Sequence, residues 1–160
     1  MKKAFIAYFS CGGTTKALAQ KLSELTGGEL YEIKPAVPYT DADLDWTDSH
    51  ARSTVEMQNS ASRPALSGPL PNLADYDTVF VGFPIWWYVA PTIICSFLER
   101  VHLSGKTVVP FATSGSSGVG KTDSQLHAVC PSDVNWKAAR RFSGRASKAE
   151  LAAWIESLDL

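Results

Sequence analysis

The sequence predicts an α/β fold in which helices cover both faces of a parallel sheet. Two observations lead to this class. Short apolar runs of strand-forming residues alternate along the chain with segments whose apolar residues recur at helical spacing. Loops rich in glycine, serine and threonine follow some of the apolar runs. Repetition of strand and helix is typical of parallel sheets, whose ligands bind beyond the carboxyl ends of the strands.

The N-terminal part predicts a strand, a helix and a second strand. Residues 3–9 (KAFIAYF) form a compact apolar run, which we interpret as the first strand. A helix is expected from about Thr15 to Gly27-Gly28, because glycine commonly follows the last turn of a helix. Residues 30–33 predict the second strand. The apolar face of the helix is formed by Leu18, Leu22 and Leu25.

A long excursion, residues 34–76, follows within what we interpret as a single domain spanning residues 1–160. It is rich in proline and has no strong hydrophobic periodicity, so we expect only one irregular helix, at about 41–56. Long loops in compact domains are commonly functional.

The third and fourth strands are predicted at residues 78–83 (TVFVGF) and 107–112 (TVVPFA). The helix between them has Pro91 in its first turn and ends before Gly105. Its core-facing residues are Ile93, Ile94, Phe97, Leu98 and Val101.

The C-terminal part predicts a weaker helix at 121–129 and a short last strand at 134–136. Ser147 and Glu150 have the spacing of a capping box, which starts the final helix. That helix is expected to bury Leu151, Trp154, Ile155 and Leu158.

Composition argues against several classes of function. The net charge of −1 gives no basic surface for nucleic acid, and no apolar run approaches the roughly 20 residues of a membrane span. The apolar start is short and leads directly into a turn, so we interpret it as a strand rather than a signal peptide. The three cysteines are widely spaced, which argues against a disulfide or zinc framework and favours a cytoplasmic setting: Cys11, Cys95 and Cys130.

The loop after the first strand is a candidate phosphate site. Its two glycines allow a tight turn, the following helix offers unpaired N–H groups, and its hydroxyls add donors, so that a phosphate is bound without a basic side chain. A capped helix after a tight turn is the structural alternative. The residues of this loop are Ser10, Cys11, Gly12, Gly13, Thr14 and Thr15.

Two other kinds of site use this position in α/β folds. Cys11 at a helix N-terminus is a candidate nucleophile, but a Cys-x5-Arg phosphatase needs arginine where Ala17 stands. A redox role for Cys11 stays open. The dinucleotide-binding pattern G-x-G-x-x-G is not matched by Gly12-Gly13.

The loop after residues 78–83 carries three consecutive aromatic side chains. Neighbours in an extended loop cannot all face one core, so at least one ring is expected at the ligand edge, where an indole stacks well on a flat heteroaromatic ligand. Packing under the excursion or in a protein interface is the alternative. The loop consists of Pro84, Ile85, Trp86, Trp87 and Tyr88.

The loop after residues 107–112 offers backbone groups to the edge of a flat ligand. Residues 115–122 (GSSGVGKT) also satisfy the P-loop pattern for a nucleoside triphosphate. We reject that interpretation, because only 38 residues follow Thr122 and no later strand ends in an aspartate for magnesium. The candidate ligand residues here are Thr113, Ser114, Gly115, Ser117 and Gly118.

Together the three loops resemble those of flavodoxins, most closely the small bacterial flavodoxin-like domains with a P-x-W-W segment. The first loop is similar to the motif S-x-[ST]-G-x-T, which binds the phosphate of FMN, except that Gly12 replaces a hydroxyl residue. The motif G-x-P-x-W is matched by Gly82, Pro84 and Trp86. The motif T-S-G-x-S-G-x-G is matched by Thr113, Ser114, Gly115, Ser117, Gly118 and Gly120.

This resemblance covers nearly the whole chain. It implies a flavodoxin-like three-layer sandwich with a five-stranded parallel sheet in the order 2-1-3-4-5, and FMN as cofactor. It also implies that Trp86 stacks on the isoalloxazine, with Trp87 and Tyr88 at its edge. Many electron-carrier flavodoxins have a second aromatic in the third loop, which this chain lacks. The candidates to cover that flavin face are Tyr39, Trp46 and His50.

The function implied is electron transfer by bound FMN, with a redox partner protein or a small-molecule acceptor. One alternative is an NAD(P)H-dependent FMN oxidoreductase acting on quinone-like acceptors. Another is a flavin-free regulatory or structural domain. The absence of a nicotinamide-binding signature slightly favours the carrier. We predict no general acid or base and no metal ligand.

Overall fold

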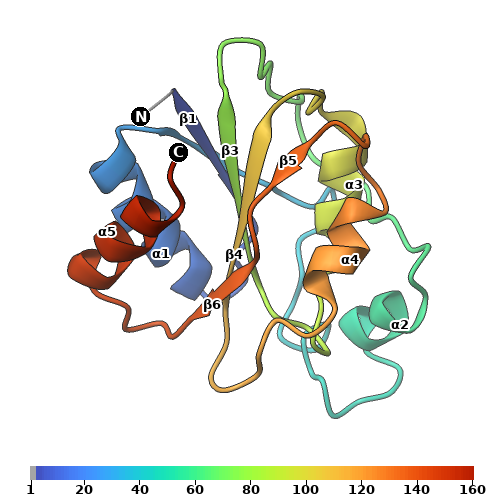
Figure 1. The fold of residues 1–160 in the computed structure, drawn as a ribbon. Helices are drawn as coiled ribbons and strands as arrows, with labels where there is room; N and C mark the ends of the chain where they lie inside the picture. The colour runs from blue at the N-terminus through green and yellow to red at the C-terminus, as the bar shows by residue number, and fades with distance from the viewer. Residues whose placement is uncertain (1–2) are drawn as a thin grey trace.

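The computed structural model describes residues 3–160, which form a parallel sheet between two layers of helices (Figure 1). Strand β1 (Ala4–Tyr8) pairs with β2 (Glu29–Glu32) on one side and with β3 (Thr78–Pro84) on the other. Strand β3 then pairs with β4 (Thr107–Thr113). The order β2-β1-β3-β4-β5 confirms the predicted α/β fold of the flavodoxin type.

The last position of the sheet is divided between two short strands. Strand β5 (Asn135–Trp136) pairs with the start of β4, and β6 (Arg140–Phe142) pairs with its end. The sequence analysis predicted β5 but missed β6, so the sheet has six strands rather than five. Between them the backbone N–H of Ala139 donates to the Asp123 carboxylate at 3.0 Å instead of to a neighbouring strand. This contact interrupts the strand.

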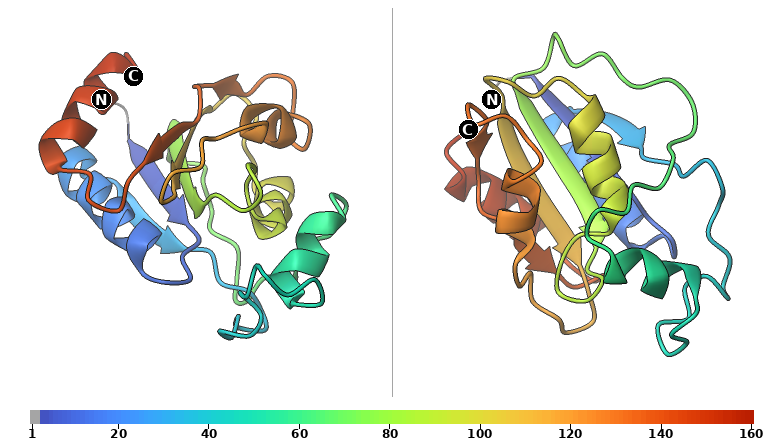
Figure 2. Two further views of the ribbon diagram at one scale, coloured as in Figure 1. Left: turned by 90° about the horizontal axis from the view of Figure 1, so that it is seen from below. Right: turned by 90° about the vertical axis from the view of Figure 1, so that its right-hand side faces the viewer.

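The helices cover both faces of the sheet, as predicted (Figure 2). Helices α1 (Thr14–Thr26) and α5 (Lys148–Ser157) lie on one face. Helices α3 (Thr92–Arg100) and α4 (Thr122–His127) lie on the other. Because both faces are covered, β1 is buried along its whole length, with alternate side chains entering the two apolar clusters.

Two of the three predicted core residues of α1 are buried. Leu18 and Leu22 of α1 are buried, but Leu25 is 36% exposed, so its assignment to the core was wrong. The last turn of α1 is closed by Thr26, whose hydroxyl donates to the carbonyl of Leu22 and accepts from the N–H of Gly28. Leu25 lies on the outer side of this turn.

The excursion contains a shorter and later helix than expected. Helix α2 (Arg52–Gln58) replaces the irregular helix predicted at 41–56, and turns occupy residues 41–50. Asp45 and Asp48 explain the difference, because their carboxylates accept hydrogen bonds from the N–H groups of Thr47 and His50. These local bonds compete with helical ones.

The final helix begins as predicted. The Ser147 hydroxyl accepts a hydrogen bond from the N–H of Glu150 at 3.1 Å, which is one half of the capping box. Leu151 and Trp154 are buried, whereas Ile155 and Leu158 are partly buried against the same cluster.

Within residues 3–160, no helix has the length and apolar character of a membrane span. In the same part of the chain, no three His, Cys, Asp or Glu side chains gather as metal ligands.

Candidate functional site

The three loops singled out in the sequence border one cavity of about 1110 Å³ at the carboxyl ends of the strands. All the predicted site residues line it except Gly13 and Gly118. Gly13 instead caps α1 with φ of 87°, and Gly118 lies in the third loop outside the lining. The carboxyl ends of β1, β3 and β4 lie at the lower edge of the sheet in Figure 1.

The first loop presents backbone donors to the cavity. Within the described residues, the N–H groups of Gly12, Thr14 and Thr15 donate no hydrogen bond. The Ser10 hydroxyl oxygen accepts from the N–H groups of Gly13 at 3.1 Å and Lys16 at 3.2 Å, so Ser10 shapes the loop. Its O–H hydrogen remains available, and with the unpaired N–H groups it can donate to an anion.

A buried hydroxyl pair joins the first loop to the third. The side chains of Thr15 and Thr113 share a hydrogen bond of 2.8 Å. Both residues are buried, so the pair holds the start of α1 against the end of β4.

The second loop ends in a tight two-residue turn. Trp86 and Val89 exchange backbone hydrogen bonds of 3.0 Å and 3.2 Å. Trp87 and Tyr88 occupy the two central positions with φ of 50° and 65°, the left-handed values of a type I′ turn. Their side chains are 45% and 62% exposed, so both rings stand at the rim of the cavity.

Neighbouring segments hold this turn in place. A Cβ added at Gly120 would lie 2.3 Å from the carbonyl oxygen of Tyr88, so the chain approaches the turn closely where only glycine fits. The Gln125 side chain bonds both the N–H and the carbonyl of Ala90 at 2.9 Å. The turn is therefore fixed on the α4 side.

Trp86 is half-buried and packed edge-on against two other rings. The centroid of its ring lies 5.7 Å from that of Phe9 and 5.6 Å from that of Tyr39. One comes from the end of β1 and the other from the excursion. Trp86 thus has a fixed orientation where it lines the cavity.

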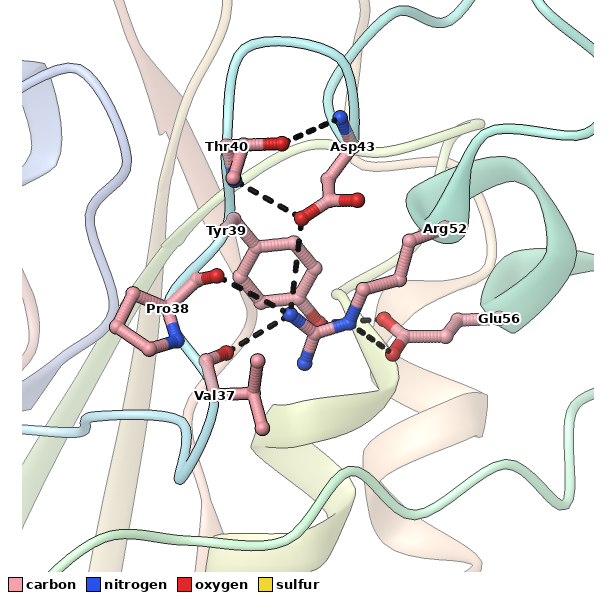
Figure 3. A network of polar contacts seen from close by, with 7 residues as sticks. All are labelled: Val37, Pro38, Tyr39, Thr40, Asp43, Arg52 and Glu56. Atoms are coloured by element: carbon pink, nitrogen blue, oxygen red, sulfur yellow. Dashed lines mark hydrogen bonds and ion pairs between the residues drawn. The ribbon is translucent and has the colours of Figure 1, made fainter.

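A polar network in the excursion fixes Tyr39 in turn (Figure 3). The Arg52 guanidinium lies 3.9 Å from the centre of the Tyr39 ring and pairs with Glu56 at 3.1 Å. The Tyr39 hydroxyl donates to the same Glu56 carboxylate. Burial, together with this hydrogen bond, raises the pKa of Tyr39 above its ordinary value.

Arg52 also contacts Val37 and Asp43 at the start of the excursion. Arg52 donates to the carbonyl of Val37 at 2.8 Å and lies 3.9 Å from the Asp43 carboxylate (Figure 3). Asp43 and Thr40 exchange side-chain-to-backbone hydrogen bonds, which close the turn beside it. The network anchors the segment that carries Leu44 and Trp46 to the cavity.

The third loop is fixed by an arginine that sequence reasoning missed. Arg141, on β6, donates to the Ser114 hydroxyl at 3.0 Å and to the carbonyls of Ser114 and Gly115 at 2.7 Å and 2.6 Å. These carbonyls are therefore already paired. The Ser114 hydroxyl donates in turn to the carbonyl of Ser117, and Ser116 and Ser117 also line the cavity.

The P-loop pattern has the wrong structure for a triphosphate site. Thr122 is fully buried, and its hydroxyl donates to the carbonyl of Val119 at 2.5 Å. A P-loop hydroxyl must instead be free to ligate magnesium. Residues 119–122 serve to position the aromatic turn.

Cys11 lines the cavity but is not an activated thiol. Desolvation by the surrounding protein raises the pKa of Cys11 to about 11, and the opposing effect of the Arg52 charge is smaller. At neutral pH the side chain is a neutral thiol, whereas a cysteine nucleophile acts as thiolate.

Several cavity residues were not among the predicted ligands. Trp46, named only as a candidate cover, lines the cavity and is 74% exposed, whereas Tyr39 supports Trp86 and His50 lies outside the lining. The loop after β6 also reaches the cavity. The residues missed are Leu44, Ser53, Ser116, Ser143, Gly144 and Arg145.

Only a weak indication of the loop after β6 was present in the sequence. Residues 140–142 (RRF) form no apolar run, so β6 and the loop that it carries could not be recognised from periodicity. Gly144 was the available clue: a Cβ there would lie 2.8 Å from the Thr14 side chain, which shows a close approach of this loop to the first one.

Comparison with known proteins gives a consistent result. The family model described as flavodoxin matches residues 3–158. A search of curated proteins gave no match.

Solved structures include relatives over the whole length of the chain. A candidate flavoprotein from Bacteroides eggerthii is 46% identical, with a TM-score of 0.93, over 100% of this chain and 99% of that one. A second, from Bacteroides uniformis, is 48% identical, with a TM-score of 0.91, over 97% and 98% of the two chains.

A more distant structure is a flavoprotein from Lactobacillus acidophilus in complex with FMN. It is 23% identical, with a TM-score of 0.69, over 97% of this chain and 99% of that one, and this likeness concerns the fold. The match to the family model over nearly the whole chain decides the assignment. This chain belongs to the flavodoxin family.

Proposed function

We propose that this chain binds FMN in the cavity at the carboxyl ends of the strands and works as an electron-transfer protein. The observation that carries the proposal is the convergence of the three loops on one cavity. It combines free N–H donors at a helix start with a fixed indole, which suits a ligand with a phosphate at one end and a flat ring at the other.

The first loop fits the phosphate. Gly12 has no neighbour within 4 Å of an added Cβ, so the backbone there is open to a ligand. The unpaired N–H groups of Thr14 and Thr15 open helix α1, whose dipole is positive at this end.

The second and third loops fit the ring. Trp86 is held by its edge-on contacts with Phe9 and Tyr39, so a stacked ring would meet a platform that does not have to be reordered. Thr113, Ser114 and Gly115 of the third loop line the edge of the cavity, and among the described residues the Gly115 N–H has no hydrogen-bond partner. Bound FMN would supply the redox chemistry, and these residues would bind, orient and partly dehydrate it.

An alternative function is an NAD(P)H-dependent oxidoreductase acting on quinone-like acceptors. The observation that favours it is room beside the ring: the third loop carries no aromatic side chain, and Trp46 stands exposed at the cavity. A flat acceptor would stack there. For the carrier, the acceptor is a redox partner protein that meets the exposed rings of Trp87 and Tyr88.

The first experiment is a titration of the apoprotein with FMN, followed by tryptophan and flavin fluorescence. We expect quenching of both signals with micromolar or tighter affinity. Trp86→Ala should weaken binding about 5- to 150-fold, the range for loss of an aromatic stacking partner. Trp136→Phe is the matched control, because Trp136 packs against His127 outside the cavity. Absence of binding by the unmodified chain contradicts the proposal.

A second measurement separates the two functions. The loaded protein is mixed with NADH or NADPH and a soluble quinone, and loss of nicotinamide absorbance is followed. Steady oxidation of NADH or NADPH assigns the oxidoreductase function. If the nicotinamide is not oxidised but a separate reductase reduces the bound flavin, the carrier function is assigned.

A further inference from the structure

The cavity is lined by uncharged residues with one exception. Among residues 3–160, the lining contains no aspartate, glutamate, lysine or histidine, and its charged member is Arg145. The positive charge of Arg145 is therefore not balanced by a carboxylate in the lining, and it attracts a negative group to its end of the cavity.

Arg145 belongs to the part of the cavity that the first loop borders. The adjacent Gly144 packs so closely on Thr14 that an added Cβ would lie 2.8 Å from the threonine methyl. Thr14 is one of the residues with an unpaired backbone N–H. The arginine and the free donors therefore lie on neighbouring segments.

The backbone beside Arg145 is held on both sides. Phe142 is buried and ends β6, and the carbonyl of Ala146 accepts a hydrogen bond of 2.8 Å from the Lys21 side chain on α1. The Arg145 N–H donates to the Ser143 hydroxyl at 3.3 Å. A charged side chain on an anchored loop loses less conformational freedom when it binds.

Other arginines around the site are already occupied. Arg141 bonds the third loop, Arg52 pairs with Glu56, and Arg140 pairs with Glu150 at 3.7 Å. Among the described residues, the Arg145 side chain has no carboxylate partner and no hydrogen bond. Its guanidinium is free to receive a ligand.

We propose that Arg145 is a specificity-determining residue that pairs with the flavin phosphate and makes the site select FMN over riboflavin. The inference rests on the proposed function and adds a cation to a loop that binds phosphate through neutral donors. A guanidinium matches phosphate oxygens in geometry and charge, and such bonds are stronger than those between neutral groups.

The test compares FMN with riboflavin, which has the same ring and no phosphate. Dissociation constants are measured by flavin fluorescence at low and high salt for the unmodified chain, Arg145→Gln, Arg145→Lys and Arg100→Gln. Arg100 is exposed at the end of α3, outside the cavity, so its variant controls for the loss of one positive charge.

We expect Arg145→Gln to weaken FMN binding about tenfold at low salt, to leave riboflavin binding within about twofold, and to reduce the salt dependence of FMN binding. Arg145→Lys should recover part of the loss, and Arg100→Gln should bind as the unmodified chain does. Equal FMN affinity in Arg145→Gln and the unmodified chain would overturn this inference and leave the proposed function intact. Equal weakening for both flavins would also overturn it, since it would mean a structural role. If the unmodified chain binds neither flavin, the proposed function fails and the inference with it.

Discussion

The first loop and the excursion border the same cavity, but different interactions hold them in place. The first loop is fixed by short neutral contacts at the end of a buried strand: Gly13 turns the chain, the Ser10 hydroxyl accepts from two N–H groups, and the Thr15 hydroxyl bonds that of Thr113. The excursion is fixed by long charged side chains, chiefly Arg52 with its partners. The comparison teaches that the sheet sets the position of the first loop at the cavity, whereas a polar network that single substitutions can remove sets the position of Tyr39 against Trp86.

The largest effect on stability is expected at Gly82, where the packed sheet leaves no room for a side chain. A Cβ at Gly82 would lie 2.1 Å from the ring of Phe111, so Gly82→Ala forces two buried strands apart. We expect a loss of about 3 kcal/mol in the free energy of unfolding, measured by urea denaturation. Gly12→Ala is the matched control, because nothing lies within 4 Å of its added Cβ. Similar stability of the two variants would contradict this account of the sheet.

A smaller and local effect is expected in the excursion. Arg52→Gln removes the contact with Tyr39 and the pair with Glu56, at a cost of about 1 kcal/mol. Hydrogen exchange should accelerate in residues 37–56 and stay unchanged in β1 and β3. Arg140→Gln is the control, since Arg140 also lies over a ring, that of Phe142, and pairs with a glutamate. Unchanged exchange in residues 37–56 would show that the network does not hold the segment.

The smallest effect is expected at Cys11, where the two regions meet. The rate of alkylation by iodoacetamide should rise with pH through the pKa of about 11, rather than level off above the ordinary value. Because Arg52 lowers this pKa, Arg52→Gln should raise it and slow the reaction at a given pH by roughly twofold. Peptide mapping by mass spectrometry assigns the label. A rate that levels off near pH 8.5 would contradict the expected desolvation of the thiol.

Local patterns in the sequence were sufficient for the main strands and for the loops that form the cavity, and the resemblance to flavodoxins supplied the order of the sheet. Apolar runs located β1, β3 and β4, and the loop after each of them reached the cavity as expected. Contacts between residues far apart in the sequence could not be predicted from local patterns. Arg141 and Arg145 act through β6, whose three residues form no apolar run, and Tyr39 depends on Arg52 through a fold-back of the excursion.

The turn at Trp87 and Tyr88 has a consequence for how this chain would respond to selection for heat resistance. Left-handed backbone costs an ordinary residue about 1–2 kcal/mol, and asparagine followed by glycine relieves that cost in a type I′ turn. Replacing the two aromatic residues in this way is therefore an easy route to a more thermostable chain. It would also remove both rings from the rim of the cavity. Stabilised descendants of this chain would need to be screened for ligand binding, because this gain in stability is located at the site itself.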